Sequence, residues 1–304
     1  MLFYWIGQQR KLNDMKNIIL IIMTLMKTTG LSIIQMLIRV ERYGTSSTLV
    51  EQGRERDLYR TRYGDLFWLN KSSCIDECII NAGIYEKESI RIINRFVKPG
   101  DIVLDVGANI GYYSVLLSKL VGQFGRVYAF EPTDNFCKIL QLNIGANNLQ
   151  NVEIVKMGLS NKIQELEIKI GNSSATLHSQ ADDDFLSKEL IKLTSLDKFI
   201  VQNPLEKIDF IKLDIDGHEP LFFEGASNTL NKYNPIILLE VSHIHYLEAG
   251  FKAWDFYGSL KQQNYYIYHE HNLEEITSQE QFLIKCANFA YSSNIVITKN
   301  RLTL

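Results

Sequence analysis

The sequence has no excess of basic residues. Its 304 residues include 32 Lys and Arg against 35 Asp and Glu, which gives a formal net charge of −3. Because nucleic-acid-binding domains usually carry a basic patch or stripe, we expect no nucleic-acid partner.

The four cysteines form no C-x-x-C pair. This argues against a disulfide framework or a cysteine zinc site, and it favours free thiols in a reducing, cytoplasmic compartment.

The sequence also has no uninterrupted apolar run of the roughly 20 residues that span a bilayer. The longest N-terminal run, Asn17 to Met26, is broken by Lys27 and Gly30 and has no convincing signal-peptide cleavage site after it. We expect residues 1–47 to form an N-terminal helical extension that packs on the core or on a partner chain, including a second copy in a homo-oligomer. Contact of residues 15–42 with the inner-membrane surface is the alternative. Met15 is a second candidate start of the chain.

A glycine-containing turn stands at the centre of the chain. An apolar run at 102–104 ends on Asp105, the turn Gly107-Ala-Asn-Ile-Gly111 follows, and 112–121 has a helical apolar pattern. A strand, a glycine turn and a helix in this order form the first unit of a nucleotide-binding α/β fold. The turn does not have the spacing G-x-G-x-x-G of dinucleotide-binding folds. Asp105 suits a cationic amino group better than a phosphate, so S-adenosylmethionine fits this turn.

A second acid supports the same ligand. The next predicted strand, 126–131, ends on Glu131. A carboxylate at this position can accept both ribose hydroxyls, and its charge repels a 2′-phosphate. Either acid alone could be an ordinary turn or cap residue, but the pair on consecutive strands favours a nucleoside site.

From about Trp68 to Asn300, the chain resembles the FkbM family of S-adenosylmethionine-dependent methyltransferases. The resemblance is carried by Gly83-Ile-Tyr-Glu86, Pro99-Gly-Asp101, Leu104-Asp-Val-Gly-Ala-Asn-Ile-Gly-Tyr-Tyr113, Phe130-Glu-Pro132, Ile211-Lys-Leu-Asp-Ile-Asp-Gly-His-Glu219, Glu224-Gly-Ala226 and Pro235-Ile-Ile-Leu-Leu-Glu240. One departure is Asp216, where the family more often has Glu.

The resemblance implies an α/β class I methyltransferase fold. This is a Rossmann-like, seven-stranded, mostly parallel sheet with strand order 3-2-1-4-5-7-6 and helices on both faces. We divide the chain into the extension 1–47, lead-in strands and a helix over 48–98, and a methyltransferase core over 99–304. The resemblance also implies O-methylation of a hydroxyl on a sugar or secondary metabolite.

The patterns around the core motifs predict further elements. We expect a helix over 82–97 that closes over the cofactor, an antiparallel strand over 164–170 and a mobile polar loop over 171–189 near the substrate. Core strands are predicted at 152–155, 208–213 and 234–240, a helix at 254–263, and closing strands at 265–269 and 293–298. The residues that we expect to bind the cofactor are Glu86, Asp105, Gly107, Asn109, Gly111, Tyr112, Glu131 and Ser160.

Ligands of such sheets bind at the carboxyl ends of the strands. There we predict that Asp214 and Glu240 line the acceptor site and that His243 or His218 acts as the general base. Asp214, Asp216 and Glu240 could instead hold Mg²⁺, although Asp216 could equally cap the turn. We do not favour a metal. The pairs 243/245 and 269/271 could each place two histidines on one strand face, but no acid or cysteine at a fixed spacing completes a zinc site.

These patterns favour an S-adenosylmethionine-dependent O-methyltransferase that modifies a sugar hydroxyl of a polysaccharide, lipopolysaccharide or glycolipid. A nicotinamide-dependent oxidoreductase shares the fold and the ribose acid, but the missing third glycine argues against it. A non-catalytic scaffold that binds the cofactor is the second alternative.

Overall fold

The computed structural model describes residues 41–42, 48–51, 54–171, 173–177, 186–287 and 292–303. The predicted helices of the N-terminal extension lie outside these residues, as do three aspartates of the polar loop, 182–184. Within the described residues, no helix is both long enough and apolar enough to cross a membrane.

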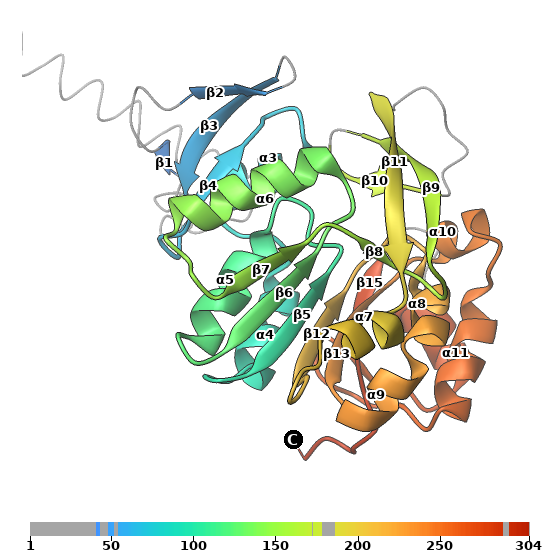
Figure 1. The fold of residues 1–304 in the computed structure, drawn as a ribbon. Coiled ribbons are helices and arrows are strands. Elements are labelled where there is room, and N and C mark those ends of the chain that lie inside the picture. The colour runs from blue at the N-terminus through green and yellow to red at the C-terminus, as the bar shows by residue number, and fades with distance from the viewer. Residues whose placement is uncertain are drawn as a thin grey trace, which may run out of the picture.

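A seven-stranded sheet forms the centre of the protein (Figure 1). Its order is β14-β15-β13-β12-β5-β6-β7, which is the order that the family resemblance implies. Only β15 runs antiparallel to its two neighbours. The strands are β5 (Ile102–Val106), β6 (Arg126–Phe130), β7 (Val152–Val155), β12 (Phe210–Leu213), β13 (Ile236–Val241), β14 (Tyr266–His269) and β15 (Ser293–Thr298).

Helices cover both faces of this sheet because its strands are apolar on both sides. Successive side chains of a strand point to opposite faces, so Val103 packs with α4 and α5 whereas Leu104 packs with α7 and α8. The helices of the first face are α4 (Lys87–Phe96), α5 (Tyr112–Val121) and α6 (Asp134–Ala146). Those of the other face are α7 (Leu196–Gln202), α8 (Glu219–Gly225), α9 (Ser227–Tyr233), α10 (His243–Glu248), α11 (Ala253–Gln262) and α12 (Gln279–Lys285).

Strands of the lead-in segment, together with one short strand from the end of the extension, form a small antiparallel sheet beside α6. Its strands are β1 (Glu41–Arg42), β2 (Thr48–Glu51), β3 (Arg54–Arg60) and β4 (Leu66–Leu69). Asn143 of α6 and Asn147, which caps the C-terminus of this helix, accept hydrogen bonds from the backbone N–H groups of Trp68 and Leu66, at 2.7 and 2.9 Å. These side chains therefore satisfy backbone N–H groups of β4 that would otherwise bond to a neighbouring strand.

The helix predicted over 82–97 is wrong at its start. Helix α3 (Cys74–Ala82) ends at Gly83, whose left-handed backbone (φ 69°) closes the helix, and α4 begins only at Lys87. Glycine adopts this conformation without a Cβ clash, so it commonly follows the end of a helix. Glu86 consequently lies in the connection between the two helices.

An excursion between β7 and β12 forms a third sheet, ordered β10-β9-β11-β8. Its strands are β8 (Gly158–Leu159), β9 (Gln164–Ile170), β10 (Ala175–Thr176) and β11 (Ser187–Thr194). The predicted antiparallel strand over 164–170 is confirmed as β9. The segment 171–189, predicted to be a loop, contains β10 and the start of β11.

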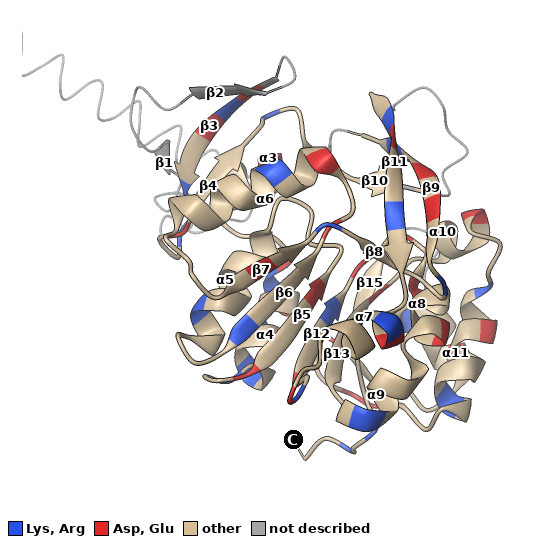
Figure 2. Cartoon of the chain, viewed as in Figure 1, with Lys and Arg blue, Asp and Glu red and all other residues tan. Residues whose placement is uncertain are grey.

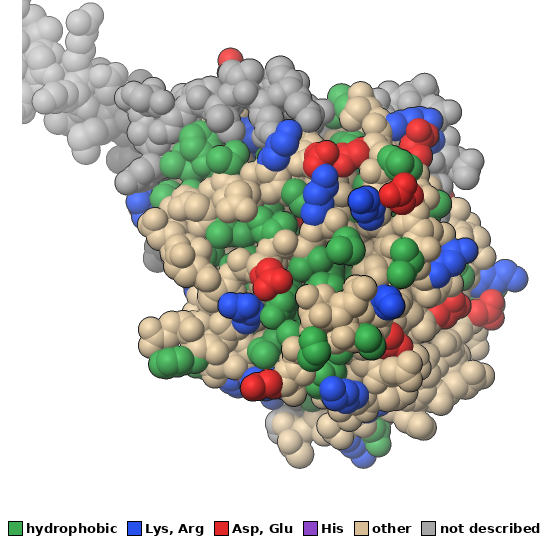
Figure 3. All heavy atoms as spheres, viewed as in Figure 1, with side chains coloured by type: hydrophobic (Ala, Val, Ile, Leu, Met, Phe, Trp, Pro, Cys, Tyr) green, Lys and Arg blue, Asp and Glu red, His purple; other side chains and the backbone are tan. Residues whose placement is uncertain are grey.

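Acidic and basic side chains are interspersed along the helices and strands (Figure 2). On the face shown in Figure 3, hydrophobic side chains are exposed between charges of both signs. The most exposed large hydrophobic residues are far apart in the chain, and they include Phe124, Val201 and Ile163. Single apolar side chains on a surface are normal for a folded protein.

Candidate active site

The glycine turn after β5 approaches the end of β12 too closely for any side chain. Gly107 has a φ of +84°, and a Cβ on it would lie 1.8 Å from the backbone oxygen of Asp214. The N–H groups of Gly107 and Ala108 both donate to the backbone oxygen of Phe130, at 3.0 and 2.9 Å. The turn is therefore fixed between the ends of β6 and β12. Gly111 has a φ of +85° and begins α5.

Asp105 lies beneath this turn and not in a cavity. Its side chain is buried, and Ser114 Oγ donates to Oδ2 at 2.5 Å. Burial raises the pKa of Asp105 to about 6, although the bond from Ser114 and the charge of Lys212 lower it. The prediction that Asp105 meets an amino group of the ligand is not supported by this placement. Instead, Asp105 joins the end of β5 to the first turn of α5.

A first cavity opens at the carboxyl ends of β5 and β6. Its walls combine a large apolar part with a few polar groups. It is lined by Val106, Gly107, Asn109, Phe130, Glu131, Pro132, Phe136, Gly158, Leu159, Ile168, Ala175, Leu177, Ile191, Leu193, Asp214, Ile215, Asp216 and His218. Much of the apolar wall comes from β9 and β11, so the excursion covers this cavity and does not only flank a substrate.

Glu131 is the buried acid of the first cavity. Its Oε1 accepts hydrogen bonds from the N–H and the hydroxyl of Thr133, at 3.0 and 2.7 Å, and its Oε2 accepts from the N–H of Asn109 at 2.9 Å. Burial raises the pKa of Glu131 to about 7, and the bonds from Thr133 and Asn109 lower it. These bonds fix the carboxylate at the point where a ribose would pass.

Ser160 and His218 form a pair on the far side of the first cavity. His218 Nε2 lies 2.8 Å from Ser160 Oγ. Ser160 is fully buried and does not line the cavity, whereas His218 does. The predicted contact of Ser160 with adenine is therefore indirect in this structure. His218 lies in the first cavity and does not line the second, which argues against it as the base for an acceptor.

A second cavity continues from the first. The two share Gly107, Asn109, Asp214 and Asp216. The second cavity is lined by Ile75, Tyr85, Gly107, Ala108, Asn109, Ile110, Tyr112, Tyr113, Ser174, Asp214, Asp216 and Glu240. Aromatic rings thus face carboxyl groups across the second cavity. The Nδ2 of Asn109 donates to the backbone oxygen of Ser173 at 2.8 Å, which ties the glycine turn to the excursion.

Tyr112 and Glu86 hold the lead-in segment against this cavity. The Tyr112 hydroxyl accepts the N–H of Tyr85 at 2.9 Å. Glu86 lines neither cavity. Its Oε2 accepts from Asn294 Nδ2 at 3.0 Å and from the hydroxyl of Tyr113. Glu86 therefore fastens the connection between α3 and α4 to α5 and β15, and the cofactor contact that we predicted for it would need another orientation of its side chain.

Lys212 is a site residue that the sequence analysis missed. It is almost fully buried, its Nζ lies 2.9 Å from Asp214 Oδ2, and it lies 5.1 Å from the centre of the Tyr113 ring. The signal was present, because Lys212 interrupts the otherwise apolar run 210–213. A buried lysine almost always has a partner, and the only acid two residues away is Asp214.

The pKa values of Asp214 and Glu240 are shifted in opposite directions. Burial opposes the charge of Asp214, but the Lys212 ammonium and a hydrogen bond with Glu240 hold the pKa of Asp214 below its usual range. Burial and the neighbouring Asp214 charge raise the pKa of Glu240 well above its usual range. Two carboxyl groups this close do not both ionise. Of the two, Asp214 therefore holds the negative charge more readily.

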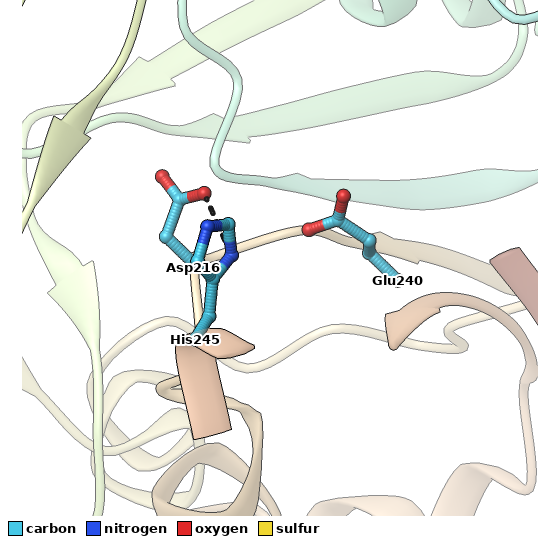
Figure 4. A group of neighbouring side chains, drawn as sticks. All are labelled: Asp216, Glu240 and His245. Carbon is cyan, nitrogen blue, oxygen red and sulfur yellow. Dashed lines mark ion pairs between the residues drawn. The ribbon is translucent and has the colours of Figure 1, made fainter. Parts of the chain in front are cut away.

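The prediction about the histidines that follow β13 is wrong in part. Residues 243 and 245 do not share a strand face, because α10 begins at His243 and residues two apart on a helix point in different directions. His243 is buried, with its ring 6.2 Å from that of Trp254, and it lines neither cavity. His245 instead points toward the acids, with Nδ1 3.5 Å from Asp216 Oδ1 (Figure 4).

The N-terminal cap of α10 could have revealed this arrangement. The Ser242 hydroxyl accepts the N–H of His245, and a serine that precedes a helical pattern is a typical helix start.

Asp216 occupies the turn before α8 with a φ of +50°. Burial and the charge of Asp214 raise the pKa of Asp216 to about 6, while His245 lowers it.

Comparisons with known proteins agree with this geometry. The model of the methyltransferase FkbM domain matches residues 105–275, which is more than half of the chain. The hexuronic acid methyltransferase AglP of Haloferax volcanii is 26% identical over 155 residues, which are 50% of this chain and 61% of that protein. A ribosomal protein L11 methyltransferase of Caldanaerobacter subterraneus is 37% identical over 73 residues, which are 24% of this chain and 23% of that protein. The chain thus spans at most about three fifths of these curated relatives.

Two solved structures are similar to the chain at low identity. The methyltransferase FkbM of Methylobacillus flagellatus aligns with a TM-score of 0.41 and 13% identity, over 74% of this chain and 52% of that one. An S-adenosylmethionine-dependent O-methyltransferase of Thermotoga maritima aligns with a TM-score of 0.41 and 15% identity, over 86% of this chain and 88% of that one. The domain model matches more than half of the chain and the strand order agrees with it, so this chain belongs to the FkbM family of S-adenosylmethionine-dependent methyltransferases.

Proposed function

We propose that this protein transfers a methyl group from S-adenosylmethionine to a hydroxyl of a sugar, in a polysaccharide, lipopolysaccharide or glycolipid. The observation that carries the proposal is the second cavity, which joins the first at Gly107 and presents the ionised Asp214 at the junction. A methyl acceptor in the second cavity would meet the cofactor at that junction. Membership of the FkbM family favours this activity over a nicotinamide-dependent oxidation.

The residues of the first cavity fit S-adenosylmethionine. Glu131 offers carboxylate oxygens to the ribose hydroxyls, and the apolar walls that include Phe136, Leu159 and Ile191 suit an adenine ring. Gly107, which has no side chain and lines both cavities, lies at the end where the methionine part would bind. When bound, the cofactor supplies a methyl group that is activated by its sulfonium.

The acceptor side has the groups that hold and deprotonate a hydroxyl. Asp214 would accept the hydroxyl proton as the acceptor oxygen displaces the sulfur of a bound cofactor from the methyl carbon. Lys212 keeps Asp214 ionised for this step. Tyr85 and Tyr112 line the same cavity, and their rings offer flat apolar surfaces to the C–H faces of a sugar. The hexuronic acid methyltransferase AglP, a relative at 26% identity, supports a sugar acceptor.

Binding and turnover test different parts of this proposal. In calorimetry of the purified protein, we expect micromolar binding of S-adenosylhomocysteine and none of NAD. Binding of NAD alone would refute the cofactor assignment. With labelled S-adenosylmethionine and cell-envelope glycan fractions as acceptors, we expect label in a base-stable methyl ether. Label in a base-labile ester or in protein would contradict O-methylation of a sugar hydroxyl. Absence of transfer to any acceptor, with the cofactor bound, would favour the scaffold.

The acceptor-side assignment is tested by variants. We expect Asp214→Asn to lower kcat by at least about 100-fold, the lower end of the usual contribution of a general base, with an unchanged affinity for S-adenosylhomocysteine. Asp255→Asn, on the exposed surface of α11, is the matched control and should transfer methyl groups at the normal rate. Equal activity of both variants would exclude Asp214 as the proton acceptor.

A further inference from the structure

Three side chains that could bind a metal ion lie together near Asp214, and two of them, Asp216 and Glu240, line the second cavity. Asp216 comes from the turn after β12, Glu240 from β13 and His245 from α10. One carboxylate oxygen of each acid and one imidazole nitrogen all lie within 4.8 Å of one another. Figure 4 shows the three side chains converging, with the imidazole between the two carboxyl groups. The ligand atoms of a single cation have separations of this size.

The imidazole contributes an observation of its own. The Nδ1 atom of His245 has no exposed surface, although the side chain as a whole is 35% exposed. It makes no hydrogen bond within the described residues, and its 3.5 Å separation from Asp216 Oδ1 is a long ion-pair contact. A buried polar atom without a partner is costly, and each one in a native protein needs an explanation such as an ion or a water. A neutral imidazole nitrogen is also one of the commonest metal ligands in proteins.

The charges around the group also favour a cation. Lys212 contacts Asp214 at 2.9 Å. Among the described residues, neither Asp216 nor Glu240 forms an ion pair with a lysine or an arginine. Three partly buried carboxyl groups, those of Asp214, Asp216 and Glu240, therefore lie near one buried ammonium group, and a bound cation would balance the remaining negative charge.

We propose that Asp216, Glu240 and His245 bind a divalent cation, with Mn²⁺ the best match. Two carboxylates and one imidazole suit a metal that accepts both oxygen and nitrogen ligands, which Mn²⁺ does more readily than Mg²⁺. Three protein ligands leave positions open for water or an acceptor hydroxyl. This set differs from the predicted magnesium site, because Asp214 is paired with Lys212 and His245 takes its place.

The role of the cation rests on the proposed function. Neither of the two histidines predicted as the general base, His243 and His218, lines the second cavity. A divalent cation lowers the pKa of a hydroxyl that reaches it, so that a weak base suffices to take the proton. The cation site would supply the activation that the predicted histidine base does not.

The test measures metal binding without cofactor or acceptor. Mn²⁺ is titrated into the purified full-length protein, and the free ion is followed by electron paramagnetic resonance. We expect one saturable site in the wild type. Because both substitutions remove a metal ligand, His245→Ala and Asp216→Asn should each raise the Kd for Mn²⁺ by at least about 10-fold. His271→Ala, an exposed histidine outside both cavities, is the matched control and should bind like the wild type.

A cooperative urea unfolding transition shows that each variant is folded, and binding of S-adenosylhomocysteine to the wild type separates this proposal from the previous one. Absence of saturable Mn²⁺ binding to the wild type would overturn the metal site, and so would variants that bind Mn²⁺ as tightly as the control. Methyl transfer that persists at the full rate after exhaustive chelation would leave the proposed function intact and refute the role of the cation in it.

Discussion

Replacing Lys212 with methionine tests whether the buried ammonium group maintains the charge of the acceptor site. Methionine preserves much of the length and apolar character of the side chain, so the change removes mainly the charge 2.9 Å from Asp214 Oδ2. Breaking a buried ion pair from one side costs about 3–5 kcal/mol. Because the Asp214 side chain is 29% exposed, water can compensate for part of the loss. We expect the free energy of unfolding to fall by about 3 kcal/mol at pH 7.

The pH dependence of this loss has a definite sign. The folded-state pKa of Asp214 lies below its ordinary value of 3.8, so the pair contributes stability above pH 3.8 that disappears as the pH falls through the folded pKa. The raised pKa of Lys212 keeps its own contribution complete below its ordinary value of 10.5. The difference between wild type and variant should therefore be largest between pH 6 and 8 and should shrink below about pH 4.

Urea unfolding followed by tryptophan fluorescence measures both effects. Lys207→Met is the matched control, because Lys207 lies 2.9 Å from Asp209 but is 45% exposed. An exposed ion pair contributes at most about 1 kcal/mol. If Lys212→Met were no less stable at pH 7 than Lys207→Met, the ammonium group would not be what stabilises the Asp214 charge.

Two further predictions concern the glycine turn and a buried acid. Gly107→Ala should lower the free energy of unfolding by about 3 kcal/mol or more and weaken S-adenosylhomocysteine binding, because a Cβ would clash with the Asp214 backbone. Gly64 has nearly the same φ but open space around it, so Gly64→Ala should lower the free energy of unfolding by only about 1 kcal/mol. Equal losses in urea unfolding would show that the close approach is unimportant. Burial raises the pKa of Glu219 to about 8, and one of its oxygens has no hydrogen-bond partner within the described residues. The folded protein thus binds this proton more tightly than the unfolded chain, and wild-type stability should fall relative to Glu219→Gln by up to about 4 kcal/mol as the pH rises from 4.5 to 8. Parallel pH profiles of the two proteins would contradict this.

Local patterns in the sequence were sufficient to predict the core of the fold. The apolar run before Asp105, the glycines of the turn and the helical pattern after it specify a strand, a turn and a helix, because each depends on the conformational preferences of neighbouring residues. Glu131 was assigned to the ligand cavity because it ends the next strand, and the carboxyl ends of parallel strands lie at one edge of a sheet. These inferences needed no long-range information.

The roles of individual acids and histidines depended on the tertiary structure. Asp105 and Asp214 both end parallel strands, but one is buried under α5 and the other faces two cavities, and nothing in their own sequence neighbourhoods distinguishes them.

The sequence alone thus determined which segments form the sheet and which edge of it carries the site. Only the tertiary structure decided the pairing of Lys212 with Asp214 and the approach of His245 to Asp216 and Glu240. Neighbouring residues on a helix differ in direction by about 100°. Which side chain of α10 faces the acids therefore depends on the residue at which the helix begins. Burial and charge, which set the protonation of the acids, depend on neighbours that are distant in the chain.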